Sequence, residues 1–122
     1  MSSGNISVLT LTVKAAGALV ACRFVEQDGT YPAAGGNAFG VTRSSAGAAG
    51  DLVPVDVLGT TLVEWGGTVA VDDVLMADAS GRAVTATVGA KFPLGKAREA
   101  GVSGGVGEAL LVPNAGLVTA AS

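Results

Sequence analysis

Three closely spaced acids are the first residues in this sequence that could do chemistry. Asp72 and Asp73 are adjacent, and Asp78 follows in the same segment. A hard cation such as Ca²⁺ is bound by several oxygen atoms, but the segment lacks a full acidic loop with a closing glutamate. We therefore expect a solvated turn whose charges discourage edge-to-edge aggregation. The remaining acids are scattered along the chain, so we assign no catalytic residue.

A glycine cluster, GVSGGVG at residues 101–107, is the second candidate. Closely spaced glycines allow backbone amides to approach a phosphate. A phosphate-binding loop, however, has Lys and Ser or Thr directly after its last glycine, and a dinucleotide fingerprint opens a helix. Here Gly107 is followed by EALLVP. The segment therefore predicts a surface loop and not a cofactor site.

Composition excludes several function classes. The chain has 122 residues, no histidine and one cysteine, Cys22. Without histidine it has neither the usual near-neutral proton shuttle nor the base of a Ser-His or Cys-His pair. A single cysteine forms no intrachain disulfide, and we expect a buried structural thiol. The net charge of -3 has the wrong sign for a protein that neutralises phosphates. We expect no enzyme activity, cofactor, metal, nucleic acid, membrane or small-molecule substrate.

The elements that position these residues are predicted to be strands. Leu9, Leu11 and Val13 alternate with threonines, and Val53, Val55 and Val57 alternate with Pro54 and Asp56, which is the period of a half-buried strand. The turn sequences EQDG and DASG predict hairpin connections. Candidate strands lie at residues 9–13, 18–25, 39–42, 53–57, 60–65, 74–77, 82–88, 92–97 and 106–112. With no long helical pattern, the sequence predicts an all-β, single-domain small barrel with Gly-rich loops and extended termini.

A weak repeat divides the chain. Residues 39–55 can be laid over residues 93–113, which pairs Gly40 with Gly95, Arg43 with Arg98, and Asp51 with Glu108. Two similar strand-loop-strand units would explain the match. Chance similarity in a chain rich in Gly, Ala and Val explains it equally well.

The segment GGTVAVDDVLMADASGRAVTA is similar to biotinyl and lipoyl carrier domains, but its DASGR hairpin has no lysine to modify. The wider pattern resembles the capsid cement, or head decoration, proteins of tailed bacteriophages. The matching strings are AFGVTR, AGAAGDLVPVDVLG, the carrier-like segment, LGKA and GEALLVP, between about Ala15 and Pro113. The resemblance implies a small β-barrel or β-tulip that binds the outside of the expanded capsid.

The same resemblance implies a homotrimer whose partner is the major capsid protein. The protein would be made in the host bacterial cytoplasm and act on the outer surface of the virion, stabilising contacts between capsomers. We divide the chain into an arm or first strand (1–13), a barrel (14–113) and a tail (114–122). Residues 3–13 are hypothesised to add a strand to a capsid-protein edge. Candidate capsid or subunit contacts are Ile6, Val8, Leu9, Leu11 and Trp65.

Two alternatives remain open for the function, and one for Trp65. The chain could be a carrier or ligand-binding accessory module with a concave pocket. It could also be another virion component, such as a head-fibre base. Trp65 ends the segment TTLVEW before two glycines, where a large side chain either fills the core or anchors a neighbouring subunit. The core interpretation of Trp65 is favoured.

Overall fold

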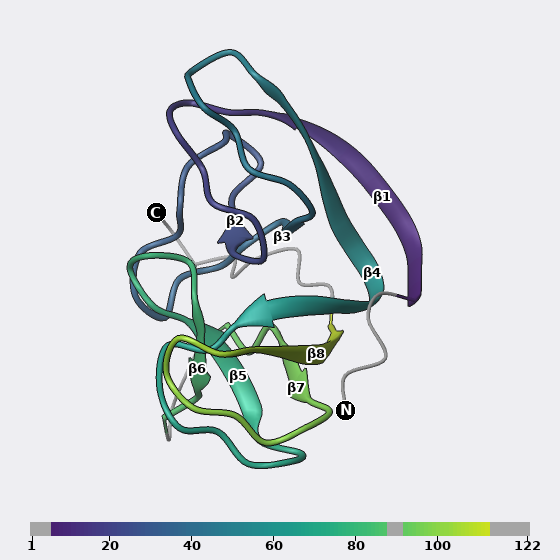
Figure 1. Ribbon diagram of the computed structural model, residues 1–122, viewed down its shortest axis with the longest axis vertical. Helices are drawn as coiled ribbons and strands as arrows, with labels where there is room; N and C mark the ends of the chain where they lie inside the picture. The colour runs from purple at the N-terminus through teal and green to yellow at the C-terminus, as the bar shows by residue number, and fades with distance from the viewer. Residues whose placement is uncertain (1–5, 88–91, 113–122) are drawn as a thin grey trace, which may run out of the picture.

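The protein is an all-β domain built around one long strand. The computed structural model describes residues 6–87 and 92–112, and within these ranges it contains strands and no helix. The strands are β1 (Ile6–Lys14), β2 (Phe24–Val25), β3 (Gly40–Thr42), β4 (Leu52–Glu64), β5 (Val74–Ala77), β6 (Ala83–Thr85), β7 (Gly95–Ala97) and β8 (Val106–Leu111). Figure 1 shows β4 passing from the upper part of the molecule, beside β1, to the lower part, beside β8. In the part of the chain described here, nothing helical is long and apolar enough to cross a membrane.

The strands form one antiparallel sheet that curls on itself. Its order is β2-β3-β4-β8-β7-β5-β6, and β1 pairs with β4 outside this path. The two ends of the sheet meet where the Phe24 N–H donates to the Gly81 carbonyl at 2.6 Å. A parallel bridge between Trp65, directly after β4, and Ala83 of β6 also joins the middle of the sheet to its β6 end. The predicted small all-β barrel is therefore confirmed as a nearly closed sheet.

Two bulges bend the β1–β4 pair. The register runs from Ser7 opposite Gly59 to Leu9 opposite Leu58 and then to Thr10 opposite Asp56. One strand gains an extra residue at each shift: Val8 on β1 and Val57 on β4. Gly59 has a φ of +102°, and a Cβ there would collide with the Ile6 carbonyl. Bulges increase local twist, so β4 turns here from one half of the molecule into the other.

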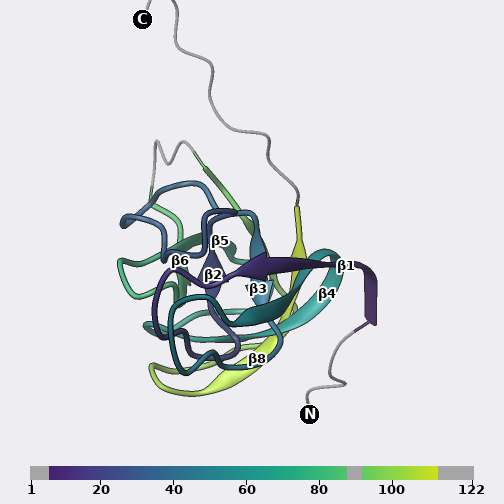
Figure 2. The same ribbon diagram turned by 90° about the horizontal axis from the view of Figure 1, so that it is seen from above.

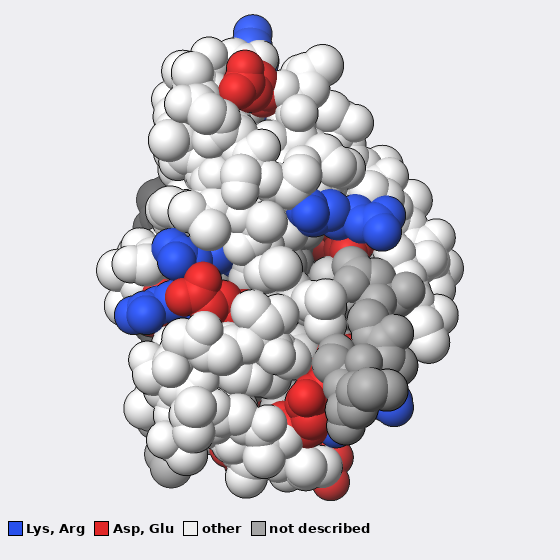
Figure 3. Space-filling view, viewed as in Figure 1, with Lys and Arg blue, Asp and Glu red and all other residues white. Residues whose placement is uncertain are grey.

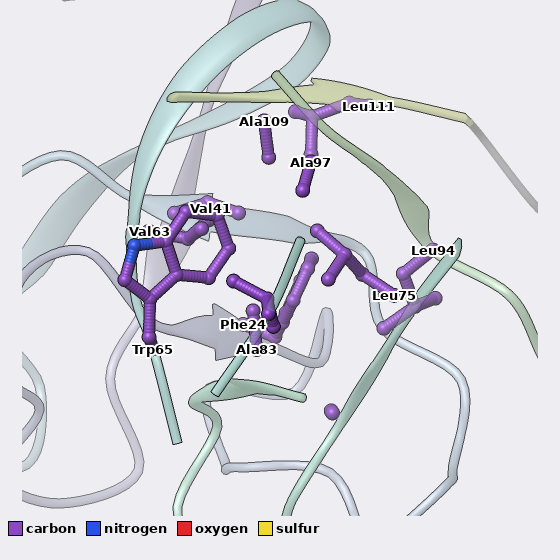
Figure 4. Packing of buried hydrophobic residues seen from close by; sticks show 12 residues of the cluster. Phe24, Val41, Val63, Trp65, Leu75, Ala83, Leu94, Ala97, Ala109 and Leu111 are labelled. Atoms are coloured by element: carbon purple, nitrogen blue, oxygen red, sulfur yellow. The ribbon is translucent and has the colours of Figure 1, made fainter. Parts of the chain in front are cut away.

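Each half has its own apolar cluster, and β4 contributes to both. The Val55 cluster contains Val13, Ala15, Leu19, Val25, Ala46, Val53 and Val55. The Trp65 cluster contains Phe24, Val41, Val63, Trp65, Val69, Leu75, Ala77, Ala83, Leu94, Ala97, Ala109 and Leu111. Figure 4 shows the Trp65 ring lying among side chains from several strands. Small apolar residues supply most of both clusters, since the chain has only three Phe, one Tyr and one Trp.

The glycine cluster makes room for Trp65. A Cβ at Gly101 would collide with the indole nitrogen, and one at Gly107 would lie 2.6 Å from the ring atom Cζ2. The loop is also tied to the tryptophan backbone, because the Trp65 N–H donates to the Gly105 carbonyl and the Gly104 N–H donates to the Trp65 carbonyl. These glycines therefore have a packing role, which the sequence reading of a plain surface loop missed.

Several predicted strands have different bounds in the structure. The predictions for residues 53–57 and 60–65 are wrong as separate strands, because both belong to β4. Of residues 18–25, only Phe24–Val25 are extended in a strand. The DASG turn does connect a hairpin, β5 to β6, with Gly81 at a φ of +79°. Residues 1–5 of the expected arm and the expected tail at 114–122 lie outside the described residues.

Part of the weak repeat has a structural counterpart. β3 and β7 are both short, begin with glycine and pair antiparallel with the strand that follows them. A Cβ at Gly40 would collide with the Asp56 carbonyl, and one at Gly95 would collide with the Leu110 carbonyl. Both glycines therefore allow the same close approach of two backbones.

The arginines of the repeat also correspond, whereas the proposed pair of acids does not. Arg43 Nε lies 3.5 Å from the Asp56 carboxylate, and Arg98 Nε lies 3.2 Å from the Glu108 carboxylate. Each arginine thus contacts a buried acid on the next strand. Asp51, the residue predicted to match Glu108, is exposed and accepts bonds from the N–H groups of its own loop. That part of the alignment is wrong.

Candidate functional site

β1 exposes apolar side chains along almost its whole length. Of its nine residues only Val13 is buried. Ile6 is 66% exposed and Val8 71%, while Leu9 and Leu11 are about two-fifths exposed. A strand of a folded core normally buries one face. β1 does not, so its apolar side chains are available to another surface.

Hydrogen bonds hold β1 to β4 and thereby to the rest of the domain. Its register with β4 runs from Ile6 opposite Thr60 to Lys14 opposite Leu52. The Ile6 N–H also donates to Thr60 Oγ1 at 3.0 Å, and the Thr10 hydroxyl donates to the Asp56 carboxylate at 2.9 Å. Figure 2 shows the start of β1 at the margin of the molecule. β1 is therefore attached by directional polar contacts more than by buried area.

Asp56 is the buried polar residue beneath β1. Its side chain is fully buried, and it accepts hydrogen bonds from Thr10 on β1 and from the Thr61 hydroxyl at 2.7 Å. Arg43, with its side chain 45% exposed, lies 3.5 Å from the same carboxylate. A buried charge must be paired and hydrogen-bonded. Asp56 thereby links β1, the end of β3 and the bend of β4.

Two further exposed apolar side chains lie in a row of cross-strand neighbours that begins at Ile6 and also contains the buried Thr60 and the exposed Lys96. Cross-strand registers place Ile6 opposite Thr60, Thr60 opposite Leu110, Leu110 opposite Lys96 and Lys96 opposite Val74. In this row Leu110 and Val74 are each more than two-fifths exposed. Figure 3 shows charges gathered in a few groups on this view, with an uncharged outer right-hand margin where Figure 1 places β1. Sequence reasoning missed Leu110 and Val74, because they reach the row only through the sheet register.

Trp65 does not belong to this surface. It is 1% exposed and lies inside the Trp65 cluster. The structure thus agrees with the core interpretation of Trp65, and its inclusion among the candidate contacts is wrong for this fold. The four candidates on β1 are brought together by the structure, and their role in binding remains a prediction.

The predicted polar sites have local structural roles. One Asp73 oxygen accepts from the Ala70 N–H and the Thr85 hydroxyl, and Asp78 accepts from the Ser80 and Arg82 N–H groups. Within residues 6–87 and 92–112, no three acids or cysteines gather as metal ligands would. These carboxylates therefore organise turns.

Cys22 is half-buried, which makes it more accessible than the buried thiol expected from the sequence. Burial raises its thiol pKa above the ordinary value, and the nearby carboxylates of Glu64 and Asp56 raise it further. A raised pKa leaves the thiol protonated and weakly nucleophilic near neutral pH. The arrangement therefore favours an unreactive thiol.

An all-β domain that organises its acids in turns and exposes an apolar strand has the features of a structural binding protein. Comparison with known proteins agrees: a family model described as phage cement protein matches residues 1–113. The chain therefore belongs to the phage cement protein family, and it is a structural component of a virion. Membership in this family implies binding to a phage capsid.

The fold is shared with a solved phage structure. That structure is the head fiber gp8.5 N base of bacteriophage phi29, with a TM-score of 0.71 and 21% sequence identity. The match covers 85% of this chain and 93% of that chain. No curated protein matches the sequence. At this identity, the likeness to the fibre base shows a shared fold.

Proposed function

We propose that the protein binds the outer surface of the expanded capsid and stabilises contacts between capsomers. The partner is the major capsid protein, and β1 is the contact surface. The observation that carries this proposal is the exposure of Ile6, Val8, Leu9 and Leu11 on a strand that β4 already holds in place. Such a strand presents apolar side chains without a large ordering cost on binding.

The proposed stabilisation follows from mass action. A protein that binds the expanded shell and not its precursor lowers the free energy of the expanded state. We propose that three copies act together as a homotrimer, because linked contacts to several capsid subunits bind more tightly than one contact alone.

The test is a double substitution on β1. In Ile6→Ser with Val8→Ser, both side chains are more than three-fifths exposed, so the free energy of unfolding should change by less than about 1 kcal/mol. The affinity for expanded shells should fall at least about tenfold, because apolar contact area is lost. Affinity is measured by pelleting shells with protein at increasing free concentration.

A matched control comes from two loops joined by the Val69–Gly101 bridge beside the Trp65 cluster. Val71 and Val102 are 55% and 64% exposed, and neither lies in a strand. Val71→Ser with Val102→Ser removes comparable apolar surface, and we expect wild-type affinity for shells. An equal loss of affinity in both double variants would contradict the assignment of the contact to β1.

A second candidate function is the base of a head fibre. The fold shared with the phi29 head fiber N base favours it. A fibre base would bind the shell and also hold a second, fibre-forming chain. Shells saturated with this protein would then capture such a chain from the same phage, whereas uncoated shells would not. Saturable shell binding without that capture supports the cement function alone.

A further inference from the structure

β1 has two edges, and their backbone groups can be assigned from hydrogen bonds elsewhere in the sheet. The Pro54 carbonyl accepts from the Arg43 N–H at 2.9 Å, so Pro54 directs its polar group away from β1. Thr12 lies opposite Pro54. In an antiparallel ladder, facing residues alternate between hydrogen-bonded and non-hydrogen-bonded pairs. When one residue of a pair directs its N–H and C=O groups away from the partner strand, the other does so too. Thr12 therefore directs its groups to the edge of β1 that faces away from β4.

The same reasoning applies at Thr10. Thr10 lies opposite Asp56, whose carbonyl lies against Gly40 of β3. Asp56 thus turns its backbone toward β3, and Thr10 turns its backbone outward. Leu11, between them, directs its groups to β4. Among the described residues, β1 pairs with β4 alone.

The outward-facing segment is short because both of its ends are closed. At the N-terminal end, Val8 is the extra residue of a bulge, and the Ser7 hydroxyl donates to the Leu9 carbonyl at 3.3 Å. At the other end, the Lys14 carbonyl lies against Gly29 of the EQDG turn. Bulges interrupt a ladder. The open edge therefore spans Thr10–Thr12 and offers two N–H and two C=O groups.

We propose that an extended segment of the capsid protein pairs with this edge at Thr10–Thr12, with an apolar residue in the middle. The partner's middle residue lies beside Leu11 and places its side chain on the same face as Leu11. Its two flanking residues place their side chains on the face of Thr10 and Thr12, where polar residues fit. This inference rests on the proposed function and names the part of β1 that recognises the partner.

A capsid segment fits this edge better than a second copy of the chain. Thr10–Thr12 can form at most four backbone hydrogen bonds, given the groups assigned above, which is too few to hold two free copies together. On a shell, the exposed side chains of Ile6 and Val8 on the same strand add apolar contact. Pairing and apolar burial then act together on one partner.

Thr12→Pro tests the pairing. Proline at this position removes only an N–H that faces outward, and Pro54 shows that β4 accepts the same change while its pairing with β1 continues. Affinity for expanded shells should fall at least about tenfold, because the proline ring and the missing N–H donor both block pairing with the capsid segment. The control, Thr12→Val, keeps the N–H and should remain within about threefold of wild type. Equal affinity of Thr12→Pro and Thr12→Val would overturn the proposal.

Hydrogen exchange of the wild-type protein decides the question even if Thr12→Pro fails to fold. The Thr10 and Thr12 amides should exchange at least about tenfold more slowly on shells than in the free protein. Unchanged exchange on saturated shells would overturn strand pairing while leaving capsid binding intact. Slow exchange in the concentrated protein alone would assign the edge to a second copy and also overturn the proposal. Absence of binding by the wild type would instead refute the proposed function.

Discussion

β1 and β8 both pair with β4, but different interactions hold each of them in place. Four of the six residues of β8 are buried, and Ala109 and Leu111 lie in the Trp65 cluster. β1 is longer, yet only Val13 is buried. β8 is thus held by packing, whereas β1 is held by its ladder and by bonds to Thr60 and Asp56.

This difference separates stability from binding. Burial of apolar area is the main source of folding free energy, so substitutions around β8 should lower stability and leave the binding surface intact in the molecules that remain folded. Substitutions of the exposed apolar side chains of β1 should lower the affinity for the capsid and leave stability nearly unchanged. The substitutions below test this division.

The largest effect is expected for Trp65→Ala. The ring fills the space left by Gly101 and Gly107, so its removal leaves a cavity. The free energy of unfolding should fall by about 3–5 kcal/mol, measured by urea denaturation. A loss below about 1 kcal/mol would show that the Trp65 cluster does not depend on the ring.

Asp56→Ala should have the next largest effect and should act on both regions. It removes the acceptor for the Thr10 and Thr61 hydroxyls in a buried site. We expect a loss of about 2–4 kcal/mol in the free energy of unfolding. Exchange of the Leu11 and Val13 amides, which face β4, should accelerate. If stability fell while those amides stayed protected, Asp56 would not be an anchor of β1.

Thr10→Val isolates the β1 side of that contact. It keeps the shape of the side chain but removes the hydroxyl, which donates to Asp56 and also lies 3.0 Å from the Ser7 hydroxyl. The loss should be about 1–2 kcal/mol, because the bond is to a charged group. Thr12→Val is the matched control and should change stability by less than about 0.5 kcal/mol. Equal losses in the two variants would argue against the Thr10–Asp56 bond.

The smallest effect concerns pH and Cys22. Its folded-state pKa is raised by burial and by Glu64 and Asp56, so the folded protein holds the thiol proton more tightly than the unfolded chain. Stability should therefore be complete below the ordinary thiol pKa and decline as the pH rises through the raised value. Cys22→Ala should flatten this decline in alkaline thermal melts. Identical alkaline slopes for both proteins would contradict it.

Strand periodicity predicted the all-β class because alternation reflects local burial. It also located β1, where Leu9, Leu11 and Val13 alternate with threonines. Alternation could not show that Leu11 stays exposed while Val13 is buried, because that depends on which strands cover β1. The union of residues 53–57 and 60–65 into β4 depends on the bulge at Val57, which has no local signature.

The same limit applies to the candidate site. Leu110 and Val74 come into one row with Ile6 only through four strand registers, which bring together distant parts of the sequence. The packing role of the glycine cluster at residues 101–107 had one signal in the sequence, because a large side chain such as that of Trp65 needs small neighbours. That partnership spans a long stretch of chain and becomes visible only when β4 and β8 pair.

The most direct test is to mix the purified protein with expanded shells that lack it and with unexpanded precursors, then pellet both and measure bound copies against free concentration. We predict saturable binding to expanded shells, weaker binding to precursors, and loss of binding in the Ile6→Ser, Val8→Ser double variant. No binding to either particle, or unchanged binding by that variant, would contradict a cement function that acts through β1.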